Sequence, residues 1–294
     1  MDQADGLRNI IKKKEIASRN ETARVITVTS GKGGVGKTSL SINLAIQLRR
    51  LGKRVVVLDA DFGLANIEIM LGIRPEYNLA DLMFRGKEMR DIITYGPEEI
   101  GFISGGSGIN EMANLTRDQV FQLIQKMGEL DQYADVIIVD TGAGIGSSVL
   151  EFVAASQEVL LVATPEPTSI TDAYALLKLL NRNSSYKKGR TVVKMIANQV
   201  RNRQDADQLF DKLGMVVNKF LNIDIEYMGS VPYDPNMQKA VMRQKPLSME
   251  VSHAAAVRSI EKIARTLTDQ EEKNPHIFGI VQLFSSVIRM KFNQ

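Results

Sequence analysis

Apolar residues along this chain follow two alternating patterns. Short runs rich in valine and isoleucine, which are typical of buried strands, recur along most of its length. Between most of these runs, apolar residues recur at helical spacing. This alternation predicts an α/β fold with a doubly wound, mostly parallel sheet flanked by helices. The strands are expected at residues 24–29, 54–59, 100–103, 135–140, 158–163, 191–197 and 226–231.

The same patterns divide the chain into four segments. A polar, basic segment with a short apolar face covers residues 1–20, and the α/β pattern covers residues 22–268. Residues 269–275 are expected to form a charged linker, and residues 276–294 a final apolar helix. We therefore expect one α/β domain with a short helical extension at each terminus.

A glycine-rich octapeptide, Gly-Lys-Gly-Gly-Val-Gly-Lys-Thr at residues 31–38, follows the first expected strand. It fits the phosphate-binding pattern G-x-x-x-x-G-K-[ST], and a helix ending near Gly52 follows it. Glycines let the backbone fold around anionic oxygens, and N–H groups of the loop and helix face the phosphates. The nucleotide contacts are expected from Gly33, Gly34, Val35, Gly36, Lys37, Thr38 and Ser39.

Two lysines in this loop have different expected roles. Lys37 is expected to bind the β- and γ-phosphates, and the Thr38 hydroxyl to ligate Mg²⁺. Lys32, directly after the first glycine, is not required by ordinary phosphate-binding loops. Its presence points to a narrower class of proteins, in which a nucleotide joins two subunits.

Carboxylates lie at the ends of two expected strands, where ligands of doubly wound sheets bind. We expect Asp61 to hold and polarise the attacking water, and Asp59 to order Mg²⁺ and its waters. Asp140 ends an apolar run in the manner of a Walker B motif and would reach Mg²⁺ through water. In the alternative interpretation, Asp59 and Asp61 only cap the helix that begins near Leu64.

Further candidate nucleotide contacts follow three of the expected strands. Gly142 would let a backbone N–H sense the γ-phosphate in a switch loop. The amide of Asn198 would pair with a donor and an acceptor on the edge of adenine, although asparagine is also common in turns. Pro232 and Tyr233 are expected to form a wall of the base site.

The last helix carries a continuous apolar stripe. It is expected to lie in a membrane interface through Phe278, Val281, Phe284 and Ile288. Few basic residues accompany the stripe, so attraction to anionic lipids would be weak. The alternatives are packing on its own domain and exchange between subunits, with ATP deciding between a packed monomer and a released dimer.

Composition excludes several classes of protein. A net charge of +3 over 294 residues gives no basis for nucleic-acid binding, so no nucleic-acid partner is expected. The lack of cysteine and the presence of only two histidines argue against a disulfide framework and a zinc site. Neither a signal-peptide pattern nor an apolar run of roughly 20 residues is found, so we expect a cytoplasmic protein.

Together these residues resemble the deviant-Walker-A ATPases of the MinD/ParA group over about residues 22–268. This family implies slow, Mg²⁺-dependent ATP hydrolysis by an ATP-bound homodimer. Lys32 would cross the interface to the partner's phosphates, and Asp61 would position the water. The C-terminal helix would bind the inner face of the cell membrane in the ATP state. The motifs that carry the resemblance are residues 32–38, 59–61, 140–144 and 231–234, together with Asn198.

Within this group the chain resembles the MinD-like regulators of flagellar number and position. Gln3, Leu7 and Arg8 resemble an N-terminal activating helix, and residues 61–66 resemble the family's switch I. This branch implies an FlhF-type GTPase and flagellar C-ring proteins as partners, whereas the alternative for the N-terminus is a frayed end. The alternative functions are a division-site or cargo-positioning ATPase and a small-molecule enzyme of the same fold.

Overall fold

A computed structural model of the chain describes residues 22–61, 66–105, 117–183, 186, 188–273 and 279–292. Within these residues, eight strands form one sheet in the order β3-β4-β2-β5-β1-β6-β7-β8. The strands are β1 (Arg24–Ser30), β2 (Val55–Ala60), β3 (Thr94–Tyr95), β4 (Gly101–Ile103), β5 (Val136–Ala143), β6 (Glu158–Ala163), β7 (Val192–Val200) and β8 (Ile225–Pro232).

All seven expected strands are present, and the expected fold class is confirmed. These seven strands pair in parallel, whereas the eighth, β3, pairs antiparallel with β4. The apolar pattern did not predict β3, because it has two residues, of which Tyr95 is 57% exposed. A strand this short at the edge of a sheet has no apolar run to mark it.

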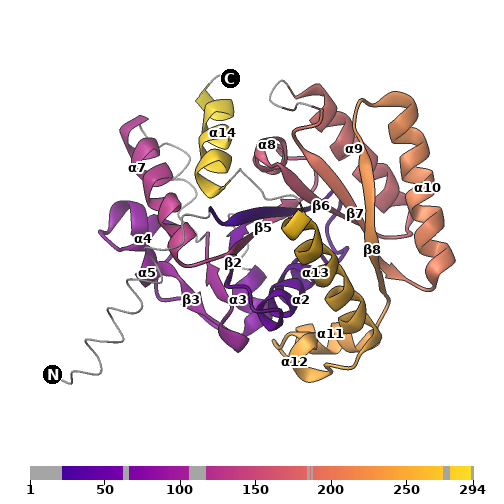
Figure 1. Cartoon of the computed structure of the whole chain (residues 1–294), viewed down its shortest axis with the longest axis horizontal. Helices are drawn as coiled ribbons and strands as arrows, with labels where there is room; N and C mark the ends of the chain where they lie inside the picture. Colours follow the sequence, from indigo (N-terminus) through magenta and orange to yellow (C-terminus); the bar gives the residue numbers. More distant parts are fainter. Residues whose placement is uncertain are drawn as a thin grey trace.

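Helices cover both faces of the sheet (Figure 1). Neighbouring residues of β1 point to opposite faces, so Val25 belongs to one core and Ile26 to the other. The core of Ile26 contains residues of α2 (Lys37–Arg50), α3 (Asn66–Leu71), α11 (Pro235–Met242), α12 (Leu247–Glu250) and α13 (Ala255–Lys273). The core of Val25 contains residues of α4 (Leu79–Phe84), α5 (Met89–Ile92), α7 (Arg117–Gly128), α8 (Ser147–Ala155), α9 (Pro167–Arg182), α10 (Arg203–Phe220) and α14 (Ile280–Phe292).

The expected linker at residues 269–275 needs correction, because α13 continues to Lys273. Two buried cations hold the end of this helix against the sheet. Arg24 donates to the carbonyl oxygen of Leu267 at 2.7 Å, and Lys194 donates to the Gln270 side chain at 2.6 Å. These tertiary contacts favour helix in a segment whose charged composition indicated a linker.

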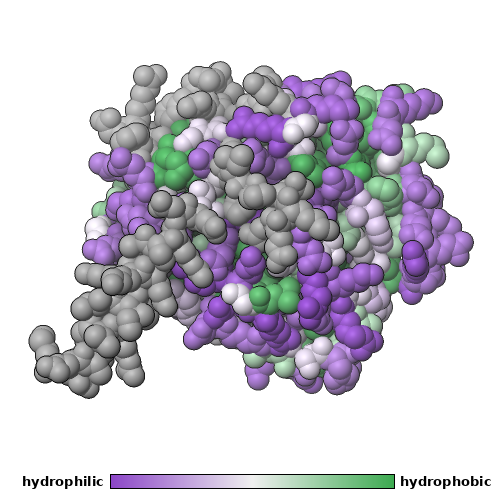
Figure 2. All heavy atoms as spheres, in the orientation of Figure 1, coloured by the Kyte–Doolittle hydropathy of each residue, from purple (hydrophilic) through white to green (hydrophobic). Residues whose placement is uncertain are grey.

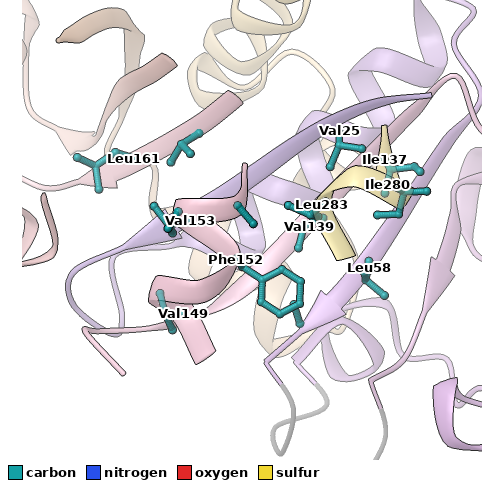
Figure 3. Packing of buried hydrophobic residues seen from close by; sticks show 14 of the residues in the cluster. Val25, Leu58, Ile137, Val139, Val149, Phe152, Val153, Leu161, Ile280 and Leu283 are labelled. Atoms are coloured by element: carbon teal, nitrogen blue, oxygen red, sulfur yellow. The ribbon is translucent and has the colours of Figure 1, made fainter. Parts of the chain in front are cut away.

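The C-terminal helix α14 packs on its own domain. Ile280, Leu283 and Phe284 are at most 3% exposed. The rings of Phe284 and Phe152 meet edge to face with centroids 5.9 Å apart, and Ile280 and Leu283 lie beside the sheet residues in Figure 3. In this structure α14 therefore packs on its own domain, which was one of the alternatives. Burial of each fully buried apolar side chain stabilises this packing by roughly 1.5–3 kcal/mol.

Of the other expected membrane contacts, Val281 and Ile288 are partly buried, and Phe278 lies outside the described residues. No helix in the described part of the chain is long and apolar enough to cross a membrane. On the face drawn in Figure 2, the coloured side chains are mainly hydrophilic and the apolar ones form small groups. Because Ile280, Leu283 and Phe284 are buried, the main apolar face of α14 lies in the interior.

Candidate nucleotide-binding site

The glycine-rich loop connects β1 to α2 at the carboxyl end of the sheet. Gly34 and Gly36 have φ of 79° and 86°, which favour glycine. A Cβ on Gly31 would lie 2.2 Å from the carbonyl group of Asp172 in α9, so this glycine allows α9 to pass directly over the loop. The loop therefore needs its glycines for backbone conformation at two positions and for close packing at a third.

Asp140, on β5, faces the first turn of α2. Its carboxylate accepts hydrogen bonds from Thr38 Oγ1 at 2.7 Å and from Ser41 Oγ at 2.9 Å. Lys37 Nζ lies 3.4 Å from the same carboxylate, and Asp140 is fully buried. The structure thus brings together three residues that the sequence analysis assigned to phosphate and Mg²⁺ binding, and it adds Ser41.

Asp59, on β2, lies in register with Asp140 on the neighbouring strand. It is 2% exposed and accepts hydrogen bonds from the backbone N–H groups of Asp61 and Ile67. Burial raises the pKa of Asp59 to about 7, the nearby Asp140 carboxylate adds to this rise, and the two N–H groups oppose it. Its contact with Ile67 also caps α3, so the capping interpretation is partly correct for this residue.

The oxygen donors of this site fit Mg²⁺. Asp59, Asp140 and the Thr38 hydroxyl offer two carboxylates and one alcohol, and Mg²⁺ is commonly held by one or two carboxylates with water and substrate phosphates. In the described part of the chain, no group of three or more His, Cys, Asp or Glu residues is placed to hold a metal ion. Mg²⁺ usually keeps several waters, so its other ligands at this site would be water and phosphate oxygens.

Asp61 follows β2 and is held by a neighbouring amide. Its Oδ2 accepts a hydrogen bond from Asn66 Nδ2 at 2.9 Å. A Cβ on Gly142 would lie 3.2 Å from Asp61 Oδ1, so Asp61 lies against the end of β5, where Gly142 was expected in a switch loop. This arrangement brings the expected water-binding carboxylate to the expected phosphate sensor.

A cavity of about 340 Å³ extends from the phosphate loop to α11. Pro232 and Tyr233 line it, as expected for a base site, and α11 adds Met237 and Val241, which the sequence did not indicate. Tyr233 is 51% exposed and lies at the open side. The size and apolar lining fit a planar purine ring.

Asn198 also lines this cavity, but its side-chain amide already forms a hydrogen bond with the phosphate loop. Its Nδ2 donates to the backbone oxygen of Val35 at 2.7 Å, and the residue is 7% exposed. One of its N–H groups is therefore engaged by the phosphate loop, and the amide oxygen and second N–H remain for a base. Gln199, which the sequence analysis missed, approaches the oxygen of Gly34 at 3.4 Å.

The ammonium group of Lys32 is bound by two side chains at the start of α9. Its Nζ donates to Glu166 Oε2 at 2.7 Å and to Thr168 Oγ1 at 2.8 Å. Both partners lie at the start of α9, and Lys32 and Glu166 are solvent-accessible. Glu166 was missed from the sequence, although its place after β6 and before Pro167 marks it as a strand-end residue. The expected partner-binding residues Gln3, Leu7 and Arg8 lie outside the described residues.

Comparisons with known proteins agree with this geometry. The ParA family model, described as NUBPL iron-transfer P-loop NTPase, matches residues 21–268. The chain is 44% identical to the antiactivator FleN of Pseudomonas aeruginosa over 242 residues, which are 82% of this chain and 85% of FleN. It is 32% identical to the flagellum site-determining protein YlxH of Helicobacter pylori, over 91% of this chain and 90% of YlxH.

Solved structures of similar fold include the MinD cell division protein of Aquifex aeolicus. That chain is 25% identical in sequence, with a TM-score of 0.65. The match covers 84% of the present chain and 97% of the MinD chain. The residues that the family model matches, 21–268, contain the sheet and the phosphate loop.

Proposed function

This chain belongs to the ParA/MinD family of P-loop ATPases, and from that premise we propose that it is a flagellar regulator that ATP switches between monomer and dimer. The observation that carries the switch is the position of Lys32. This lysine is part of the phosphate loop, yet its ammonium group is bound by Glu166 and Thr168 at the surface. A cation held in this way is available to the phosphates of a second copy.

In the proposed dimer, each Lys32 leaves Glu166 and stabilises the negative charge that develops on the partner's γ-phosphoryl group. Within each subunit, Lys37 binds the β- and γ-phosphates, and Asp61 holds the attacking water. Mg²⁺, bound by Thr38 and, through water, by Asp59 and Asp140, would neutralise phosphate charge. Loss of the γ-phosphate then removes the anion that Lys32 binds, and the dimer loosens.

Light scattering tests this proposal on an Asp61→Ala background, which is expected to bind ATP without hydrolysing it. The molar mass should double with ATP and remain that of a monomer with ADP or without nucleotide. Adding Lys32→Ala should keep the protein monomeric while a fluorescent ATP analogue still binds. A Lys32→Ala protein that dimerises normally would refute the cross-subunit role.

The second part of the proposal concerns α14 and peripheral membrane association. Exposing Ile280, Leu283 and Phe284 to water would cost roughly 5–9 kcal/mol. Insertion of the same side chains into the acyl boundary of a membrane offsets this cost. The domain and the membrane therefore compete for one helix face, and we propose that ATP-dependent dimerisation shifts this competition toward the membrane.

An engineered disulfide can lock α14 in place, because the chain has no cysteine. A Cβ on Gly128 of α7 would lie 2.9 Å from Val281 Cγ2, so Gly128→Cys with Val281→Cys brings two thiols together. The oxidised double variant should fail to sediment with phosphatidylglycerol liposomes in ATP, whereas the reduced form should sediment. Equal sedimentation of both forms would refute release of α14.

The flagellar part of the proposal is carried by the identity to FleN and YlxH over most of the chain. We propose that residues 1–20, through Gln3, Leu7 and Arg8, stimulate an FlhF-type GTPase, and that flagellar C-ring proteins are further partners. Deletion of residues 1–20 should leave ATP hydrolysis unchanged and abolish stimulation of the GTPase. If stimulation persists, the partner site lies elsewhere, and a division-site or cargo-positioning role becomes the better hypothesis.

A further inference from the structure

β7 contains an irregularity directly beside the phosphate loop. Asn198 pairs with Val231 and Val200 pairs with Pro232, so Gln199 is one extra residue on β7. Its φ is 57°, in the left-handed region that residues other than glycine rarely adopt. Bulges of this kind redirect side chains that would otherwise alternate between the two faces of a sheet.

The bulge brings two consecutive amides to the phosphate loop. Asn198 Nδ2 donates to the oxygen of Val35 at 2.7 Å, and Gln199 Nε2 donates to the oxygen of Gly34 at 3.4 Å. The two nitrogens lie 2.6 and 3.5 Å from the position that a Cβ on Gly36 would occupy. In a regular strand, one of these side chains would point to the opposite face.

These contacts determine how two peptide groups of the loop are oriented. In a trans peptide the C=O and the following N–H point in opposite directions. Holding the oxygens of Gly34 and Val35 from the β7 side therefore directs the N–H groups of Val35 and Gly36 toward the phosphate position. An anion-binding loop needs its N–H groups in this orientation.

We propose that Asn198 and Gln199 are positioning residues that shape the phosphate loop before a nucleotide binds. The proposal rests on the nucleotide site described above and adds to it a source of preorganisation. Backbone strain at a functional site persists where the surrounding structure enforces it. At Gln199, the strained backbone is what allows both amides to contact the same loop.

Both residues line the base cavity, but the strained backbone lies at Gln199, so substitutions there can test the amide and the strain separately. Gln199→Gly removes the amide and relieves the strain, so the Tm of the nucleotide-free protein should rise by about 2 °C. Affinity for ADP, measured by calorimetry, should fall by about threefold to fivefold. Backbone amides of residues 34–37 should exchange hydrogen faster in the absence of nucleotide.

Gln199→Met separates the amide from the strain, because methionine keeps the side-chain length and the backbone conformation but has no N–H donor. It should weaken ADP binding without raising the Tm. Gln244→Gly is the matched control, since Gln244 has a φ of 54°, lies against Gly72 and is not among the residues that line the nucleotide cavity. That substitution should raise the Tm and leave ADP affinity unchanged.

Two results would overturn the proposal. One is ADP binding by Gln199→Gly and Gln199→Met at the affinity of the unmodified protein. The other is unchanged hydrogen exchange in the loop of the nucleotide-free variants, which would restrict Gln199 to a contact with bound ligand. A chain that binds ADP but never dimerises with ATP would refute the switch function while leaving the role of Gln199 intact.

Discussion

The two ends of the central sheet both bury carboxylates, but the surroundings shift the pKa values of these carboxylates in opposite directions. At the amino end, Glu158 on β6 accepts from Arg24 and Lys194 at 2.7 Å each. Burial alone would raise the pKa of Glu158, but these two cations outweigh it and hold the pKa below its usual range. At the carboxyl end, burial and the neighbouring Asp140 instead raise the pKa of Asp59.

This contrast separates a structural cluster from a binding site. The amino-end charges satisfy one another and also hold α13 through Leu267 and Gln270. At the carboxyl end, the Asp59 and Asp140 carboxylates lie in register, and Lys37 Nζ lies 3.4 Å from Asp140. Such an arrangement favours the binding of Mg²⁺ and phosphate, whereas the amino-end arrangement favours the fold.

The largest effect of a single substitution is expected at the carboxyl end of the sheet. Lys37→Met should reduce kcat for ATP hydrolysis by about 100- to 1000-fold, because a charge that stabilises the transferring phosphoryl group is lost. Because Lys37 lies 3.4 Å from the buried Asp140 carboxylate, the Tm of the nucleotide-free protein should fall as well. A steady-state phosphate-release assay and a melting curve check the two statements, and a loss of kcat below tenfold would contradict the role of Lys37 in phosphate binding.

At the amino end, a substitution should lower stability without weakening nucleotide binding. Glu158→Gln removes the carboxylate that the buried Arg24 and Lys194 share and should destabilise the fold by about 3 kcal/mol. The pKa of Glu158 is lower in the folded than in the unfolded protein. Its contribution to the free energy of unfolding is therefore present above the unfolded pKa and is lost as the pH falls through the folded pKa. Denaturant unfolding of both proteins at pH 7 and pH 4 should therefore show a smaller difference at pH 4, while ADP affinity at pH 7 stays unchanged.

The smallest effect concerns Asp59 and has the opposite pH dependence. Its folded pKa of about 7 lies above the unfolded value of 3.8, so the folded protein binds more protons between these values and loses stability as pH rises through them. Asp59→Asn should therefore raise the Tm of the nucleotide-free protein at pH 8 and have little effect at pH 4. The same variant should bind Mg²⁺–ADP more weakly. An equal rise in Tm at both pH values would contradict the raised pKa of Asp59.

Much of the nucleotide site could be predicted from sequence because it is built from local segments. Residues 31–38 define a loop by glycine spacing, and Asp59 and Asp140 end apolar strands, so parallel pairing places them at one edge. Ser41 and Gln199 had no such signal. Ser41 reaches Asp140 only because α2 crosses β5, and Gln199 reaches the loop only through a bulge.

The sequence by itself determined the α/β class, seven strands, the phosphate loop and the carboxylates at the strand ends, because these follow from periodicity and from short motifs. Only the tertiary structure decided where long side chains and helix faces go. Lys32 turns to Glu166, and the apolar stripe of α14 packs on the sheet and α8. The same stripe satisfies the pattern for a membrane surface and for a protein core, since both remove apolar area from water. The choice between them depends on neighbours that no local pattern contains.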